Sequence, residues 1–285
     1  MFSPAKLNLM LRVLGRRPDG YHDLCLLNTG IDLGDEVEVE LGGQGVRVEC
    51  DHALVPLGED NLCVRAARAF LAGAPAPPDG VAIRITKRIP VAGGLAGGSS
   101  NAAAVLWALN RLTGAGRSDH DLIHLAATIG ADAPFFLFRS PAWARGKGEI
   151  LDPAPALPDW HYLLVGFPFG VSAAWAFAQW DLTSAPSCDN LKNLKKPDSI
   201  PEPGTWVNDL EPAVVARHPA VARAKQALRK AGAVGAMMSG SGPTVFGVFH
   251  KRPSAERVRA SLDLGAGGEI FLARALRGPL IRIIE

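Results

Sequence analysis

The stretch that decides the fold reads Pro90-Val91-Ala92-Gly93-Gly94-Leu95-Ala96-Gly97-Gly98-Ser99-Ser100-Asn101-Ala102-Ala103. Its four glycines let the backbone approach a ligand closely. A helix predicted to begin at Ser99 or Ser100 adds unpaired N–H groups and the positive end of a helix dipole. These features favour binding of a phosphate by the backbone. An ordinary glycine-rich connection explains the composition equally well, so the stretch alone leaves both interpretations open.

Two common nucleotide motifs do not fit this loop. Ser99 stands where a P-loop requires its lysine, and Leu95 occupies the second glycine position of a dinucleotide fingerprint. A second glycine cluster, Ser239-Gly240-Ser241-Gly242-Pro243, joins two apolar runs. The local sequence favours a hairpin turn there, and the alternative is a nest of N–H groups that faces a phosphate.

Hydrophobic periodicity predicts the elements around the loop. Residues 6–14 alternate between apolar and polar side chains, which predicts a half-buried strand with Lys6 and Asn8 on one face. Alternation at 37–41 and 46–48 predicts two antiparallel strands around a turn at 42–45. The other predicted elements are strands at 81–85, 161–165 and 270–275 and helices at 61–71, 101–112 and 219–231, with further helices that begin near 118, 134, 172 and 254.

Composition limits the class of protein. A chain of 285 residues with 48% hydrophobic and 20% charged residues is globular and long enough for two domains, which we expect at 1–155 and 156–285, separated by the proline-rich stretch 153–158. A net charge of +2 argues against a nucleic-acid partner. The four cysteines are far apart, which predicts reduced thiols. No apolar run approaches the roughly 18 residues of a membrane span and no signal-peptide layout is visible, so we expect a cytoplasmic protein without a membrane segment.

Five segments together resemble the GHMP small-molecule kinases over nearly the whole chain. The two glycine-rich segments are shared by many members of that family. The opening segment with Lys6 and the segment with Tyr21 and His22 are similar to members that act on a cytidine diphosphate-linked methylerythritol in the non-mevalonate isoprenoid pathway. The five segments are Pro4-Ala5-Lys6-Leu7-Asn8-Leu9, Arg17-Pro18-Asp19-Gly20-Tyr21-His22, 90–103, Gly130-Ala131-Asp132-Ala133-Pro134 and 239–243.

The resemblance implies an α+β fold, with a ribosomal-S5-like N-terminal domain, a ferredoxin-like C-terminal domain and the active site between them. It implies ATP-dependent phosphorylation of the substrate's 2-hydroxyl, with Mg²⁺ accompanying the nucleotide. The expected partner is therefore a small molecule, and the chain is expected to be a monomer or a homodimer.

The resemblance assigns a catalytic pair, Lys6 and Asp132. Asp132 is expected to accept the proton of the substrate hydroxyl, and Lys6 to polarise that hydroxyl. A carboxylate near a helix N-terminus and a lysine stays ionised, as a base must. From the residues alone, Lys6 is equally a surface lysine and Asp132 a helix cap beside Pro134.

The resemblance also implies how the substrate base is held. Tyr21 stacks on cytosine and His22 hydrogen-bonds its edge, although local sequence alone makes both of them turn residues. Phe177 is expected as the second wall of the cytosine slot, with Trp175 and Trp180 as competitors. Asn8 is expected on the catalytic face.

On the nucleotide side, Asn61 and Lys87 fall where the family contacts adenine. Ser100 is one candidate Mg²⁺ ligand, and Ala96 is a departure because glycine is common there in the family. The Asn208-Asp209 pair also resembles a family segment, and structural capping explains it as well. The residues assigned to the ATP phosphates are Pro90, Val91, Ala92, Gly93, Gly94, Leu95, Ala96, Gly97, Gly98, Ser99, Ser100, Gly240 and Ser241.

Three other functions stay open at this point. A GHMP kinase for homoserine or mevalonate keeps the glycine loops and has no need of Tyr21 and His22. A non-enzymatic RNA-binding protein with an S5-like fold requires a basic stripe, whereas this chain has only short clusters such as Arg16-Arg17 and Lys195-Lys196. An interaction protein with a vestigial nucleotide site does not need both Lys6 and Asp132.

Overall fold

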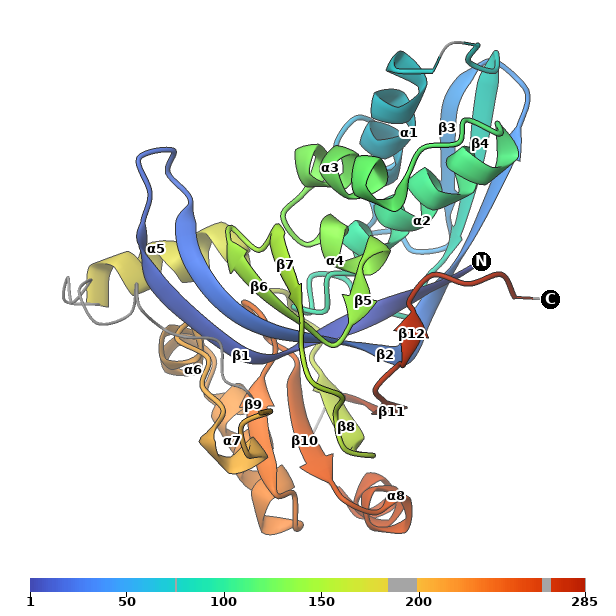
Figure 1. Cartoon of the computed structure of the whole chain (residues 1–285). Helices are drawn as coiled ribbons and strands as arrows, with labels where there is room; N and C mark the ends of the chain where they lie inside the picture. The colour runs from blue at the N-terminus through green and yellow to red at the C-terminus, as the bar shows by residue number, and fades with distance from the viewer. Residues whose placement is uncertain (75, 184–198, 263–267, 285) are drawn as a thin grey trace.

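Two β-sheets and the helices packed on them form the described part of this computed structural model, which comprises residues 1–74, 76–183, 199–262 and 268–284 (Figure 1). The larger sheet has the order β3-β4-β2-β6-β7, with β1 paired to β2, and the smaller sheet has the order β11-β8-β10-β9. The strands are β1 (Phe2–Arg16), β2 (His22–Leu41), β3 (Gly45–Cys50), β4 (Gly80–Thr86), β5 (Arg139–Ser140), β6 (Ala142–Gly146), β7 (Ile150–Pro153), β8 (His161–Gly166), β9 (Gly235–Met238), β10 (Val245–Phe249), β11 (Glu269–Arg274) and β12 (Gly278–Pro279).

The helices match most of the predicted ones. Asn61 caps the first helix, and the helix predicted to begin near 118 starts with a capping box between Ser118 and Asp121. The short helix α6 (Glu211–Arg217), directly before α7, was not predicted. The helices are α1 (Leu62–Ala72), α2 (Gly97–Leu112), α3 (Asp119–Ile129), α4 (Ala133–Leu137), α5 (Ala173–Thr183), α6 (Glu211–Arg217), α7 (Pro219–Lys230) and α8 (Arg252–Ser261), with a 3₁₀ turn at Pro203–Thr205.

The strand β1 is buried on both faces, not on one. Leu7, Leu9 and Leu11 are buried as the alternation predicts. The opposite face, which carries Lys6 and Asn8, is also buried, because the glycine-rich loop crosses it and the Lys6 N–H donates to the Leu95 carbonyl at 3.1 Å. Lys6, a catalytic candidate, and Asn8, a substrate-binding candidate, are thereby held inside the molecule.

The hairpin predicted around residues 42–45 is wrong. β4 lies between β2 and β3, antiparallel to β2 and parallel to β3. The connection from β3 to β4 contains α1, so these elements form a β-α-β crossover. Alternation of side chains identifies a strand, but it carries no information on which neighbour the strand pairs with.

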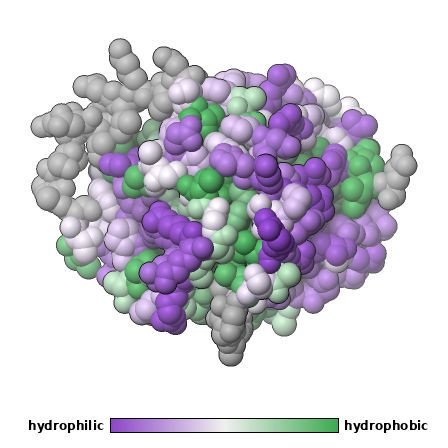
Figure 2. Space-filling view, turned by 90° about the horizontal axis from the view of Figure 1, so that it is seen from below, coloured by the Kyte–Doolittle hydropathy of each residue, from purple (hydrophilic) through white to green (hydrophobic). Residues whose placement is uncertain are grey.

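The smaller sheet has the strand order of a ferredoxin-like fold, and α7 and α8 pack on it. Figure 2 views the molecule from below, where these two helices lie, and shows mainly hydrophilic residues with apolar residues between them. The predicted α+β fold is confirmed. In the described part of the chain, no helix is long and apolar enough to cross a membrane.

The two sheets share a hydrophobic core. Ala5 and Leu27 of the larger sheet belong to the same buried cluster as Tyr162, Leu164 and Phe246 of the smaller sheet. The long β1–β2 hairpin therefore joins the two halves of the molecule (Figure 1).

The end of the chain returns to the larger sheet. β12 pairs with β5, and Leu280 and Ile281 are buried in the core that α1, α2 and the larger sheet form. The division into domains at residue 155 stays a prediction. The strands β5, β6, β7 and β12 were missed because most of them have too few residues to show a period.

No helix or strand is predicted at 183–204, and most of this stretch, residues 184–198 with Cys188 and the Lys195-Lys196 pair, lies outside the described residues. Cys25, Cys50 and Cys63 are free thiols, in agreement with the prediction for those three.

Docking of the C-terminal segment can be tested with Leu280→Ala. Leu280 is 1% exposed, so the substitution removes buried apolar atoms, and we expect the free energy of unfolding to fall by about 2–5 kcal/mol. Ile283, which is 61% exposed, is the matched control, and Ile283→Ala is expected to change it by less than about 0.5 kcal/mol. Urea unfolding of both variants measures this, and equal small effects would contradict the docking.

Candidate active site

The glycine-rich loop ends in a strained turn. Helix α2 begins at Gly97, two or three residues before the predicted onset at Ser99 or Ser100, and its N-cap Ala96 has left-handed backbone angles (φ 56°, ψ 32°). The first hydrogen bond of α2 runs from the Ser100 N–H to the Ala96 carbonyl. The N–H groups of Gly97, Gly98 and Ser99 precede it and have no acceptor within the helix, so they form an anion site at the positive end of the dipole.

A cavity of about 320 Å³ lies beside this helix end. Every predicted loop residue from Pro90 to Ser99 lines it, and so do Asn61 and Lys87. The Asn61 side chain is occupied locally: its Oδ1 accepts from the Cys63 N–H at 2.8 Å, and its Nδ2 donates to the Pro56 carbonyl at 2.6 Å. Asn61 therefore fixes the wall of this cavity.

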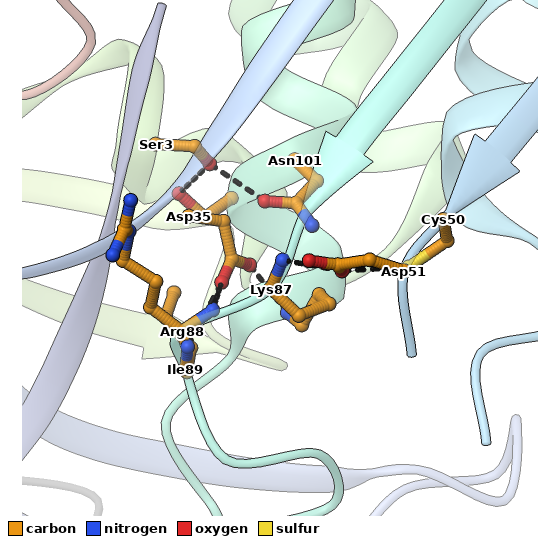
Figure 3. A network of polar contacts seen from close by, with 9 residues as sticks. Ser3, Asp35, Cys50, Asp51, Lys87, Arg88, Ile89 and Asn101 are labelled. Atoms are coloured by element: carbon orange, nitrogen blue, oxygen red, sulfur yellow. Dashed lines mark hydrogen bonds and ion pairs between the residues drawn. The ribbon is translucent and has the colours of Figure 1, made fainter. Parts of the chain in front are cut away.

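Lys87 belongs to a buried polar network at the same cavity (Figure 3). Its ammonium pairs with Asp35, which is fully buried and also accepts from the N–H groups of Arg88 at 2.8 Å and Ile89 at 2.9 Å. The Lys87 N–H donates to Asp51 at 2.8 Å. These bonds fix the chain just before the glycine-rich loop begins.

Cys63 also lines this cavity. Burial raises the pKa of the Cys63 thiol to about 12. The thiol is therefore neutral at pH 7 and serves as a small apolar part of the wall rather than as a nucleophile.

A larger cavity of about 650 Å³ lies on the other side of the loop. Ala92, Gly94 and Ala96 line both cavities, so the loop is their common wall. Molecules bound in the two cavities would therefore approach each other at this loop.

Lys6 and Asp132 lie together in the larger cavity. The Lys6 Nζ is 3.3 Å from Asp132 Oδ1 and donates to Asn8 Oδ1 at 2.6 Å. Lys6 is 4% exposed, whereas the Asp132 side chain is 37% exposed. Asp132 is the N-cap residue of α4, yet its side chain makes no capping hydrogen bond. The carboxylate therefore remains available to a ligand.

The predicted base-binding residues lie at the far end of this cavity. Tyr21 is 57% exposed, and the Lys147 Nζ lies 4.6 Å from its ring centroid. The buried His22 ring stacks on Phe177, with centroids 4.8 Å apart. Of the three aromatic candidates for the second wall, Phe177 is the one that lines the cavity.

The two tryptophan candidates lie elsewhere. Trp180 contacts the His22 ring edge-on without lining the cavity, and Trp175 stacks with the Arg217 guanidinium, whose Cζ is 4.6 Å from the ring centroid.

The second glycine cluster is a β-hairpin turn between β9 and β10 that packs on the first loop. The Ser239 hydroxyl donates to the Gly94 carbonyl at 3.1 Å, and the Thr244 N–H donates to the Gly93 carbonyl at 3.3 Å. A Cβ atom at Gly94 would lie only 2.3 Å from the Ser239 carbonyl oxygen, so this approach requires glycine. Gly240 and Ser241 line the larger cavity.

Ser100 does not fit its predicted roles. Its side chain is fully buried and hydrogen-bonded to the Ser3 hydroxyl at 2.7 Å, and its N–H is used by the helix. This position contradicts the predictions of a Ser100 phosphate contact and a Ser100 metal ligand. Ser99, one residue earlier, lines the smaller cavity.

Several residues of the site gave no signal in the sequence. Asn28 accepts from Asn8 at 2.7 Å, Asp181 bonds His22 at 2.8 Å, and Asn208 donates to the carbonyls of Met238 and Gly240, both at 2.8 Å. Apart from the Asn208-Asp209 resemblance, each is an isolated polar residue in its own segment, and its partner is distant along the chain.

Comparison with known families agrees with this arrangement. Residues 61–140 match the N-terminal domain family of GHMP kinases, and residues 190–265 match the C-terminal family. The fold and the paired cavities therefore define a small-molecule kinase of the GHMP class.

Curated relatives narrow the class. The chain is 42% identical to the 4-diphosphocytidyl-2-C-methyl-D-erythritol kinase of Syntrophotalea carbinolica, over 94% of this chain and 96% of the relative. It is 43% identical to the kinase of that name from Pelobacter propionicus, over 96% and 98%. A crystal structure of 4-(cytidine 5'-diphospho)-2C-methyl-D-erythritol kinase is 35% identical, with a TM-score of 0.77 and coverage of 98% and 99%. The chain belongs to the family of 4-diphosphocytidyl-2-C-methyl-D-erythritol kinases.

The strained turn at Ala96 can be tested with Ala96→Gly. Left-handed backbone angles at an alanine lower the free energy of unfolding by about 1–2 kcal/mol. Glycine relieves this strain, but its greater freedom in the unfolded chain offsets about 0.4–1 kcal/mol of the gain. We expect the free energy of unfolding to rise by roughly 0.5–1 kcal/mol. Ala222→Gly, inside α7, is the control and is expected to lower it by a similar amount. Thermal unfolding measures both, and a loss of stability in Ala96→Gly would contradict the strain.

Proposed function

We propose that the chain transfers the γ-phosphoryl group of ATP to the 2-hydroxyl of 4-diphosphocytidyl-2-C-methyl-D-erythritol. The observation that carries the proposal is the meeting of two cavities at one glycine-rich loop, with Lys6 and Asp132 in the larger cavity and aromatic residues at its far end. The names of the curated relatives support the choice of substrate.

In this proposal the N–H groups of Gly97, Gly98 and Ser99 hold the phosphates of ATP, whose adenosine occupies the smaller cavity. Asn61 and Lys87 form the wall there. The backbone supplies the positive potential that a P-loop obtains partly from its lysine. Gly240 and Ser241, which lie across the loop, limit the position of the transferred phosphate.

Asp132 acts as the base that accepts the hydroxyl proton. Its carboxylate is open to the cavity, makes no capping bond and lies 3.3 Å from the Lys6 ammonium. Lys6 also donates to oxygen atoms that gain charge. Because phosphoryl transfer has a loose transition state, we expect positioning and charge stabilisation to contribute more than proton removal.

The side-chain oxygen atoms near the loop fit Mg²⁺, which binds a few protein oxygens together with water and phosphate oxygens. The Ser99 hydroxyl and the Asp132 carboxylate are the residues we propose to hold it. Bound there, Mg²⁺ neutralises charge on the ATP phosphates. In the described residues no cluster of three or more His, Cys, Asp or Glu side chains forms a dedicated metal cage, which agrees with an ion carried mainly by the nucleotide.

The cytidine end of the substrate is proposed to lie against Tyr21, His22 and Phe177, with Asn8 near the reacting hydroxyl. Homoserine and mevalonate are small and carry no base, so neither would contact the aromatic end of a cavity of about 650 Å³.

A coupled assay of ATP consumption tests the substrate. We expect turnover with the cytidyl substrate and none above background with mevalonate or homoserine, because neither has a group for the aromatic end of the cavity. Turnover with one of the latter alone would refute the assignment.

Asp132→Ala tests the base. We expect kcat to fall by about two to four orders of magnitude, the usual contribution of a general base, with the fold retained because the side chain makes no capping bond. Asp159→Ala removes an exposed carboxylate in the loop before β8 and is expected to leave kcat unchanged. Steady-state kinetics give both values, and a near-normal kcat for Asp132→Ala would remove this residue from catalysis.

A further inference from the structure

Asp181 is a carboxylate of the larger cavity that the proposed chemistry does not use. It lies in α5, and its Oδ1 is 2.8 Å from His22 Nε2. Its Oδ2 faces the Arg16 guanidinium, with Nη1 at 3.9 Å. The His22 ring is buried, with Phe177 on its face and the edge of Trp180 against it. The orientation of the imidazole is therefore fixed by packing, and Asp181 meets one of its two nitrogens.

An ionised carboxylate can only accept hydrogen bonds, so Nε2 of His22 must carry a proton. In the neutral imidazole the other nitrogen, Nδ1, is then a bare acceptor. No described residue bonds Nδ1, and this atom is not among the buried polar atoms that lack a partner. Since His22 lines the cavity, Nδ1 is open to a ligand there.

A bare acceptor distinguishes two pyrimidines that have the same shape. Cytosine carries an amino group at C4, which donates, whereas uracil carries a carbonyl oxygen there, which only accepts. An acceptor at Nδ1 forms a hydrogen bond with the cytosine amino group and repels the uracil carbonyl oxygen. The charged groups that face this part of the cavity are Asp181, Arg16 and Lys147. Arg16 faces Asp181, and Lys147 lies over the Tyr21 ring.

We propose that Asp181 is a positioning residue that holds His22 in its Nε2–H form, so that Nδ1 accepts from the cytosine amino group and excludes uracil. This inference rests on the proposed function, because it assumes that the base lies against His22.

The test compares the cytidyl substrate with its uridyl analogue in the full-length enzyme. For the wild type we expect kcat/KM to favour the cytidyl substrate strongly. Asp181→Asn, whose amide can donate or accept, releases the constraint on His22, and we expect this preference to fall by roughly 10- to 100-fold. The loss should appear as a higher KM for the cytidyl substrate with kcat nearly unchanged, because Asp181 lies at the base end of the cavity.

Asp23→Asn is the matched control. Asp23 lies next to His22 on the β1–β2 hairpin, and its carboxylate pairs with Arg17 at 2.6 Å. It does not line the larger cavity, so we expect the ratio of kcat/KM for the cytidyl and uridyl substrates to stay at the wild-type value. Asp181→Glu retains the acceptor and is expected to restore part of the preference. An unchanged ratio in a folded Asp181→Asn variant would overturn the proposal.

The protonation of His22 can be read without any substrate. The ¹⁵N chemical shifts of its imidazole, assigned by comparison with His22→Gln, are expected to show a proton on Nε2 and none on Nδ1 in the wild type at neutral pH, and a mixture in Asp181→Asn. A wild-type proton on Nδ1 alone overturns the inference, whatever the enzyme phosphorylates. Failure of the wild type to turn over the cytidyl substrate instead overturns the proposed function, so the two failures are distinguishable.

Discussion

The close approach of two backbone turns is the constraint on which the rest of the structure depends. The loop at Gly93 and Gly94 touches the hairpin at Ser239 through two hydrogen bonds, and a Cβ atom at Gly94 would clash with the Ser239 carbonyl. Each turn ends elements of a different sheet. Their contact therefore fixes how the two sheets meet, and with it the wall that separates the two cavities.

The long β1–β2 hairpin connects the core between the two sheets to the site. Its inner face packs in the core shared by both sheets, its middle presents Lys6 and Asn8, and its tip presents Tyr21 and His22. A single element thus sets the separation between the part of the larger cavity at Lys6 and the part at Tyr21. Rigid placement of this kind is what an enzyme needs when positioning supplies most of the rate.

The sequence predicted those parts of the fold that depend on local chemistry. Asn61 and Ser118 cap helices because their side chains reach backbone N–H groups two or three residues away. The pairing of β3 was not predictable, since β4 comes to lie beside it only after a crossover. Likewise, Ser100 looked like a ligand in a glycine-rich loop, and the early start of α2 rotates it into the core against Ser3.

The sequence by itself determined the two glycine-rich turns and the separate motifs around Lys6 and Asp132 that carry the resemblance, because the residues of each motif are adjacent in the chain. Only the tertiary structure decided which face of β1 is buried, which aromatic residue lines the cavity and that Asp181 meets His22. The physical reason is distance along the chain: Asp181 and His22 are 159 residues apart, and no local pattern reports a contact that the packing of α5 against the hairpin creates.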